Sequence, residues 1–222
     1  QTPTRTTRGG NGKLDPTTAV QFDLAVEWYF ADYSIASIGL FTKNIEAFVQ
    51  SQGVPTPFPG VIDPDTNQPL VLTAFRPLNT GKSDMVGVEL SFQRTFADFL
   101  PAPFDGLGVV ANYTYIDSGS DFKNDKTGAS YSLPGLSENT LNFTLFYEKG
   151  PVGARISYNF RDDFLDDING GFSGHPFFVD AYEQWDASFG YVVNENIALS
   201  VEAINLTDEN VYYYNRLATG TQ

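Results

Sequence analysis

The chain lacks cysteine and contains one histidine and one methionine among its 222 residues. Without cysteine there is no disulfide framework, no thiolate zinc site and no cysteine nucleophile. The single imidazole, His175, cannot build a histidine-based metal site or a Ser/His/Asp triad without partners. These absences favour a protein that binds or passes a ligand, and we expect no enzyme.

Long hydrophobic runs and cations are also scarce. Mean hydropathy is -0.21, and no stretch approaches the roughly 18 consecutive apolar residues that a membrane helix needs. Lys and Arg number 13 against 27 Asp and Glu, giving a formal net charge of -14. This balance argues against nucleic acid as a partner, because phosphate binding requires clustered cations. Acidic loops could hold divalent cations at a lipopolysaccharide surface, although a solvated exterior is the simpler explanation.

Aromatic residues and alternating segments are abundant instead. Phe and Tyr, 19 and 12 in number, favour strands and form girdles at the membrane interfaces of barrels. Eight segments alternate apolar and polar side chains over roughly ten residues, the length that a tilted strand needs to cross a bilayer. They are residues 20–30, 34–43, 85–94, 108–116, 140–148, 153–161, 184–192 and 197–205.

The first segment indicates which face of each strand meets lipid. Its polar face carries Asp23 and Glu27, and placing such carboxylates in hydrocarbon would cost several kcal/mol. The opposite face must therefore point outward, and the same alternation predicts lipid contact for Leu90, Phe143 and Ile156. In the first segment that outward face consists of Phe22, Leu24, Val26, Trp28 and Phe30.

Connection lengths give an independent signal because they alternate between short and long. Tight turns are expected at 31–33, 149–151 and 194–196, and a wider turn with two prolines at 97–105. Long connections are expected at roughly 44–81, 118–136, 162–182 and from 207 onward. Outer-membrane barrels have short periplasmic turns and long extracellular loops. We therefore predict an all-β, transmembrane antiparallel β-barrel to which this chain contributes about eight strands.

Both ends of the sequence have the composition of loops. Residues 1–19 are polar and rich in Thr and Gly, and NRLATGTQ at the other end carries no terminal aromatic residue. We expect a segment of a larger barrel with further residues at both ends. A closed eight-stranded structural or adhesive barrel is the alternative, and a barrel enzyme is a third hypothesis that lacks a Ser/His pair.

A series of motifs then resembles a known family. They are GNGKLDPTTAVQFDLAVEWYF (10–30), FTKNIEAFV (41–49), GVELSFQR (87–94), LGVVANYTYIDS (107–118), LPGLSENTLNFTLFYEKGPVGARISYNFRDDFL (133–165) and AINLTDEN (203–210). In this order the motifs resemble the C-terminal barrel portion of a TonB-dependent outer-membrane receptor. The Leu-Pro-Gly-Leu-Ser, Tyr-Glu-Lys-Gly and Tyr-Asn-Phe-Arg-Asp-Asp runs look like the branch common in stalked and plant-associated proteobacteria.

The resemblance implies an active transporter of the bacterial outer membrane. It implies a barrel of about 22 strands with a plugged lumen, of which residues 1–222 would form the C-terminal portion without plug, TonB box or closing strand. The implied partners are the TonB energy-transducing complex acting through the plug, lipopolysaccharide and a nutrient. An oligosaccharide is the ligand that the branch suggests, and a ferric siderophore is the alternative. A surface lipoprotein that covers the mouth is a further candidate partner. No resident cofactor is expected beyond Ca²⁺.

Candidate ligand-binding residues lie in the long loops and at strand mouths. Sugar rings stack on aromatic faces while carboxylates and amides accept their hydroxyl hydrogen bonds. For each aromatic residue, loop packing or an interfacial girdle is the competing explanation. The candidates are Tyr131, Arg161, Phe164, Phe172, His175, Phe177 and Tyr213, with Phe178, Tyr212 and Tyr214 nearby.

An acidic run after residue 161 is the candidate metal site. Its carboxylates could coordinate Ca²⁺ as oxygen-rich loops do, but their spacing is not that of an EF-hand loop. Solvated acid at a strand mouth is the alternative. The residues are Asp162, Asp163, Asp166 and Asp167.

Overall fold

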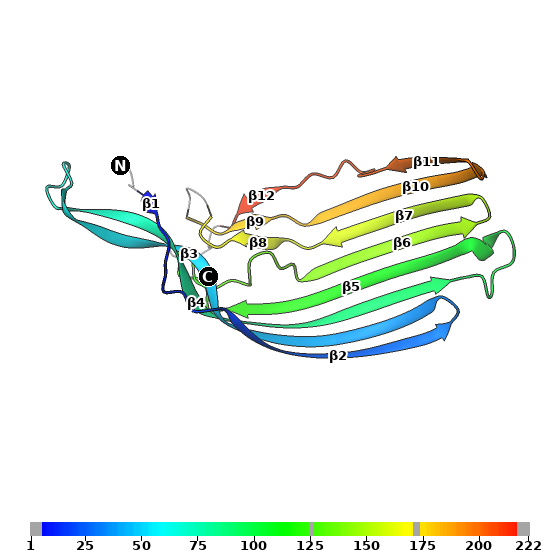
Figure 1. Ribbon diagram of the computed structural model, residues 1–222, viewed down its shortest axis with the longest axis horizontal. Helices are drawn as coiled ribbons and strands as arrows, with labels where there is room; N and C mark the ends of the chain where they lie inside the picture. Colours follow the sequence, from blue (N-terminus) through cyan, green and yellow to red (C-terminus); the bar gives the residue numbers. More distant parts are fainter. Residues whose placement is uncertain (1–5, 125–126, 171–173, 217–222) are drawn as a thin grey trace, which may run out of the picture. The chain divides into compact units, whose positions relative to one another are not determined.

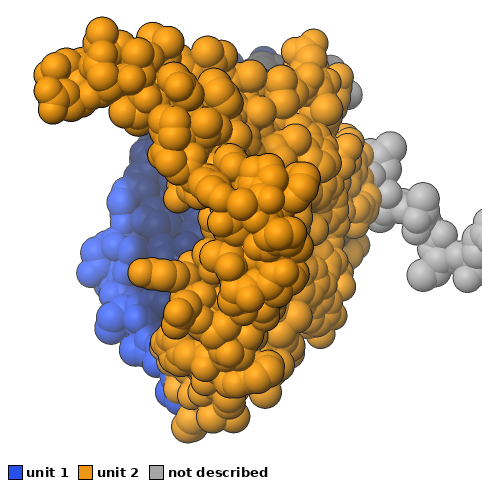
Figure 2. Space-filling view, turned by 90° about the vertical axis from the view of Figure 1, so that its right-hand side faces the viewer, with its two compact units in different colours: residues 1–20, 44–83 blue, residues 21–43, 84–222 orange. Residues whose placement is uncertain are grey.

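The computed structural model describes residues 6–124, 127–170 and 174–216. The chain divides into two compact units, coloured separately in Figure 2. Unit 1 comprises residues 1–20 and 44–83, and unit 2 comprises residues 21–43 and 84–222.

The main sheet contains every strand that the alternation predicts. The strand order is β11-β10-β7-β6-β5-β4-β3-β2, so β10 pairs with β7 across β8 and β9 and the other strands pair with their chain neighbours. β1 (Thr6–Arg8) pairs in parallel with β4. The all-β prediction is confirmed. The strands are β2 (Thr18–Ala31), β3 (Ser34–Ile62), β4 (Pro69–Thr95), β5 (Leu107–Ser120), β6 (Asn139–Lys149), β7 (Val152–Arg161), β10 (Tyr182–Asn194) and β11 (Ile197–Ala203).

Three tight turns lie at one end of this sheet (Figure 1). Each leaves only two residues between strands: 32–33, 150–151 and 195–196. Gly150 has φ of 57°, a left-handed conformation that glycine adopts without steric cost and that hairpin turns require. The predicted tight turns are confirmed.

The connection between β4 and β5 at the same end is wider. It contains η1 (Phe104–Gly106), a single short helix turn after two prolines. No helix within the described ranges has the length and hydrophobicity to cross a membrane.

The predicted loop over 44–81 was wrong for most of its length, because β3 and β4 continue through it to a turn at residues 63–68. Pro55, Pro57 and Pro59 suggested irregular structure, yet they lie within β3. Prolines at alternate positions all lack their N–H on the same edge of a strand, so the other edge can still pair. The spacing of the prolines is therefore compatible with a long hairpin.

Unit 1 holds this hairpin against the N-terminal segment through Asn79. Its side-chain amide donates to the carbonyl of Ala47 at 2.8 Å and to that of Asp15 at 2.9 Å, while its Oδ1 accepts from the Asp15 N–H at 2.8 Å. Ala47 has φ of 56°, an uncommon conformation for a residue with a Cβ. The hydroxyl of Thr17 donates to the same carbonyl at 3.0 Å, so this irregular position is held from two sides.

The register of unit 2 groups side chains by chemistry on the two faces of the sheet. Leu145 pairs with Val109 on one side and Ile156 on the other, and Ile156 pairs with Ala187. Such a row of uncharged apolar residues forms a continuous band, called the apolar face below.

The test of the predicted outward positions is their exposure. Trp28 is 66% exposed, Leu90 42%, Phe143 36% and Ile156 39%. These large apolar side chains are therefore not packed into a protein interior, as a soluble fold would require. Exposed apolar faces on strands of this length are what a bilayer-facing band needs.

The opposite face, called the lumenal face below, carries matched polar rows. Asn142 pairs with Asn112 and Asn159, and Asn159 pairs with Gln184, which makes a row of four amides. The hydroxyls of Thr144 and Ser157 are 2.9 Å apart in the next row. These groups can hydrogen-bond to water or to a polar solute across a wet interior.

Exchanging the faces at one site provides a direct test. Ile156→Arg places a cation on the apolar face and should lower the free energy of unfolding in a bilayer by about 2–4 kcal/mol. Ser157→Arg is the matched control, because the adjacent residue lies on the lumenal face. Denaturant titration of the protein in lipid vesicles measures both. Equal losses for the two variants would contradict the assignment of faces.

Candidate functional site

The hydrophobic core of unit 2 lies in its long connections and not in its sheet. The buried hydrophobic residues of this unit within the described ranges all fall in the connections after β5 and after β7. They are Phe122, Leu133, Leu165, Ile168, Phe178 and Val179. The loops at this end therefore form a packed cluster, called the loop cluster below, comprising residues 121–124, 127–138, 162–170, 174–181 and 204–216.

A second, three-stranded sheet organises the loop cluster. Its order is β12-β9-β8, with β9 in the middle, at the end of the main sheet opposite the tight turns (Figure 1). The strands are β8 (Phe164–Asp167), β9 (Phe177–Val179) and β12 (Tyr213–Asn215). The long connections were expected to be irregular. β9 pairs with β8 across nine intervening residues and with β12 across 33, and no local pattern predicts pairings of this kind.

The side chain of Asn124 joins the segment after β5 to the segment after β7. Its side-chain amide donates to the carbonyls of Ile168 at 2.5 Å and Gly174 at 2.9 Å, and its Oδ1 accepts from the Thr127 N–H at 2.7 Å. Asn124 is 1% exposed. A buried amide with satisfied donors and acceptor fixes the relative position of the segments that it joins.

Phe178 forms the aromatic centre of the loop cluster. Tyr214 stacks on it with ring centroids 5.5 Å apart, and Tyr131 meets it edge-on at 6.1 Å. The guanidinium carbon of Arg216 lies 4.2 Å from the centre of the same ring. Phe178 thus joins β9 to two other segments, around Tyr131 and at 214–216, which cover its ring.

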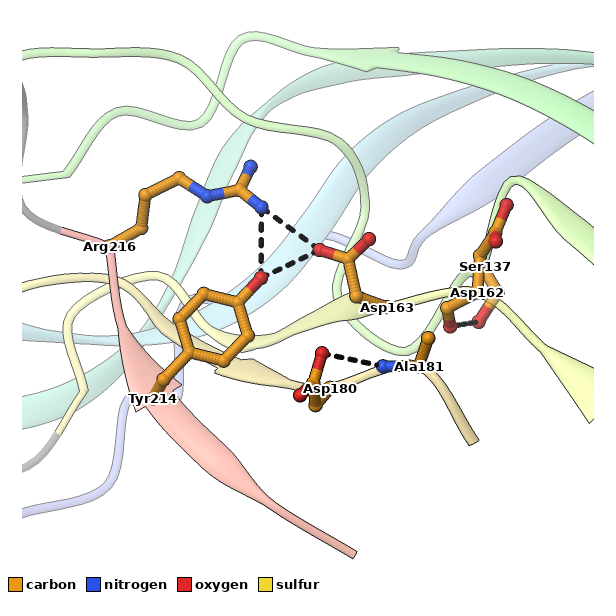
Figure 3. A network of polar contacts seen from close by, with 7 residues as sticks. All are labelled: Ser137, Asp162, Asp163, Asp180, Ala181, Tyr214 and Arg216. Atoms are coloured by element: carbon orange, nitrogen blue, oxygen red, sulfur yellow. Dashed lines mark hydrogen bonds and ion pairs between the residues drawn. The ribbon is translucent and has the colours of Figure 1, made fainter. Parts of the chain in front are cut away.

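Asp163 closes this cluster through a triangle of polar contacts (Figure 3). Asp163 accepts a hydrogen bond from the Tyr214 hydroxyl at 2.8 Å and forms an ion pair with Arg216 at 2.9 Å. Arg216 also donates to the Tyr214 oxygen at 2.9 Å. Burial and the carboxylate of Asp163 raise the pKa of Tyr214, so this phenol stays protonated and keeps donating.

Arg161 and Asp162 tie the segment before β6 to the end of β7. The Nε of Arg161 donates to the Ser137 hydroxyl at 2.6 Å, and its guanidinium carbon lies 3.8 Å from the centre of the Phe164 ring. Asp162 accepts from both the backbone N–H and the side-chain amide of Asn139, at 3.1 and 2.5 Å. The Ser137 hydroxyl donates in turn to the carbonyl of Asp162 (Figure 3).

Of the candidate ligand-binding residues, Phe177 and Tyr213 form the most accessible pair. Their rings stack at 5.4 Å with planes 12° apart, and Tyr213 is 57% exposed. Tyr131, Arg161 and Phe164 are half-buried and take part in the packing described above.

The two remaining candidates are His175 and Phe172. His175 is half-buried just before β9, and its carbonyl lies 3.4 Å from the amide nitrogen of Asn215. Phe172 lies outside the described residues.

The carboxylates proposed for Ca²⁺ do not converge on one point. Asp162 accepts a hydrogen bond from Asn139 and Asp163 accepts one from Tyr214. Asp166 and Asp167 are exposed. Asp167 accepts from the backbone N–H of Asn169 at 2.9 Å, the local turn contact typical of Asx residues. Within the described ranges no three His, Asp or Glu side chains are placed to hold a metal ion.

Several organising residues carried no signal in the sequence. Asn124 lies within the long connection expected over 118–136, and Arg216 follows the last aromatic residues near the C-terminal end. Ser137 and Asn139 lie within the motif 133–165, which gave neither residue a role. A buried role for Asn124 could have been suspected only from its place between Phe122 and the Gly128 turn.

Removing the buried amide should loosen the loop cluster. Asn124→Ala leaves buried carbonyls of two segments without a donor, at a cost of about 1–3 kcal/mol for each unsatisfied group. Hydrogen–deuterium exchange of the protein should show faster exchange over 165–170 and 174–179. Asn112→Ala, on the exposed lumenal row, is the control and should leave these segments protected. Unchanged protection in Asn124→Ala would refute the role given to this residue.

Comparison with known proteins agrees with this architecture. Residues 1–206 match the family model described as "TonB dependent receptor-like, beta-barrel". No curated protein matches the chain.

Solved structures with the same fold are receptors with longer chains. The ferric-catecholate import receptor Fiu from K12 E. coli is 20% identical, with a TM-score of 0.60 over 89% of this chain and 24% of that one. The ferric enterobactin receptor PfeA from Pseudomonas aeruginosa is 21% identical, with a TM-score of 0.62 over 90% and 27%. The ferric yersiniabactin uptake receptor FyuA from Yersinia pestis is 18% identical, with a TM-score of 0.59 over 86% and 25%.

The chain thus spans about a quarter of the length of these receptors. The family match covers nearly all of the chain, and members of this family lie in the bacterial outer membrane. It also confirms the expectation that the chain is no enzyme. The chain belongs to the β-barrel family of TonB-dependent receptors.

Proposed function

We propose that the protein to which this chain belongs is an active transporter that takes up a nutrient through the outer membrane. The observation that carries the proposal is the pairing of an exposed apolar face with polar lumenal rows in a chain of this family. The ligand first meets the loop cluster and then the lumenal amides and hydroxyls. The TonB complex supplies energy through a plug domain elsewhere in the protein.

A ferric siderophore is the ligand class that we propose first. The similar solved structures are described as ferric-catecholate, ferric enterobactin and ferric yersiniabactin receptors. Exposed Tyr213, stacked on half-buried Phe177, offers a flat surface on which an aromatic chelating group can rest. This choice depends on the similarity between the fold of this chain and the folds of those receptors.

An oligosaccharide is the second candidate, and the charges of the loop cluster favour it. A ferric catecholate complex is an anion and needs cations around it. Arg161 and Arg216 are already engaged by protein groups, and exposed Asp166 and Asp167 add negative charge nearby. A neutral sugar requires no cation and uses aromatic faces together with carboxylate and amide acceptors.

Transcription and uptake distinguish the two ligand classes. We expect the locus to be induced by iron starvation, and a deletion strain to lose uptake of a ferric siderophore. Induction and uptake loss confined to oligosaccharide medium would make the sugar the ligand. A response to neither condition would overturn both assignments. Deletion of the TonB gene should abolish the same uptake as deletion of the receptor; uptake that persists would refute the energised mechanism.

A loop variant tests the binding surface itself. Tyr213→Ala removes the exposed ring of the stack and should weaken ligand binding to the purified receptor by about tenfold, equivalent to 1.4 kcal/mol. Tyr191→Ala is the control, because Tyr191 is an exposed tyrosine on the apolar face near the tight turns. Calorimetric titration with the transported ligand measures both. Equal affinity of the Tyr213 variant and the parent receptor would exclude this surface.

A further inference from the structure

The wide turn between β4 and β5 differs from the other turns at its end of the sheet (Figure 1). It is an ordered structure: the Phe96 N–H donates to the Leu107 carbonyl and the Leu100 N–H to the Phe96 carbonyl, both at 2.9 Å. The Phe104 N–H donates to the Pro101 carbonyl at the same distance. The backbone of the turn is therefore held by its own hydrogen bonds.

The first half of the turn lies on the apolar face. Arg94 follows Leu90 and Phe92 at even positions of β4, so its side chain shares their face. Its guanidinium carbon is 5.3 Å from the ring centre of Phe30 and 4.9 Å from that of Phe99. Phe30 in turn stacks on Phe92 at 5.9 Å. Phe99 is thus joined to the aromatic end of the apolar face.

The second half of the turn is tied to the same face. The Tyr147 hydroxyl donates to the carbonyl of Pro103 at 3.0 Å, and Lys149 forms an ion pair with Asp105. Tyr147 pairs with Ala154 and Leu107 in the apolar rows. Both halves of the turn therefore curl toward the side that meets lipid, and not over the lumen.

This curl leaves two large rings uncovered. Phe99 is 56% and Phe104 is 58% exposed. The neighbouring ion pairs, Arg94–Asp98 at 3.0 Å and Lys149–Asp105, lie next to these rings. Rings beside paired charges at the edge of an apolar band have the chemistry of the membrane interface, where aromatic residues and cations meet lipid headgroups.

We propose that residues 96–106 form a membrane anchor, in which Phe99 and Phe104 insert into the phospholipid leaflet on the short-turn side. Arg94 and Lys149 lie at the level of the lipid phosphates. The occupant is the phospholipid leaflet because this surface is continuous with the apolar face of the barrel. The anchor does not depend on which ligand the receptor transports.

Depth measurement by spin labelling tests the anchor. Phe99→Cys and Phe104→Cys are made singly in the full-length receptor with other cysteines removed, and each is nitroxide-labelled. The labelled receptors are reconstituted in vesicles of phosphatidylethanolamine and phosphatidylglycerol. Asn196→Cys, in the exposed turn between β10 and β11, is the control. Collision rates with oxygen, which concentrates in the bilayer, and with a water-soluble nickel chelate give the depth of each label.

The expected result is a higher ratio of oxygen to nickel accessibility at positions 99 and 104 than at position 196. Ratios equal to that of position 196 would place the turn in water and overturn the proposal. Exclusion of both reagents from positions 99 and 104 would place the rings against protein and would also overturn it.

Discussion

A backbone that crosses hydrocarbon must satisfy every N–H and C=O group within the protein, because lipid offers no partner. In this chain the antiparallel ladders meet that requirement, and the pleat then sends alternate side chains to opposite faces. One face must be apolar and the other can be wet. The row from Val109 through Leu145 and Ile156 to Ala187, and the amide row beside it, follow directly from this constraint.

The same constraint explains where the core lies. A wall that is one strand thick, with lipid on one side and a polar space on the other, has nothing to bury between two protein layers. Hydrophobic burial in unit 2 is therefore concentrated in the loop cluster, around Leu165 and Phe178. The loop cluster is therefore a packed surface, and a preorganised surface loses less conformational entropy on binding than a flexible loop does.

Particular residues show how far the sequence could be read. Asp23 and Glu27 determined which face of the first strand is polar, and the tight turns were marked by residues such as Gly150. The three prolines of β3 misled, because their compositional signal is that of a loop while their alternate spacing permits a strand. Tyr213 and Phe178 were equivalent as loop aromatics in the sequence, yet one is mostly exposed and the other is covered by Tyr131, Tyr214 and Arg216.

The sequence by itself determined the strands of the wall, their faces and the family, because a period of two and a turn residue are local properties of the chain. Only the tertiary structure decided which loop residues are buried, which carboxylates are engaged and where the wide turn points. Those outcomes depend on contacts such as Asn124 with Gly174 and Asp163 with Arg216, which are separated by about fifty residues. Packing of distant segments selects such partners by shape and charge, and no local pattern encodes that selection.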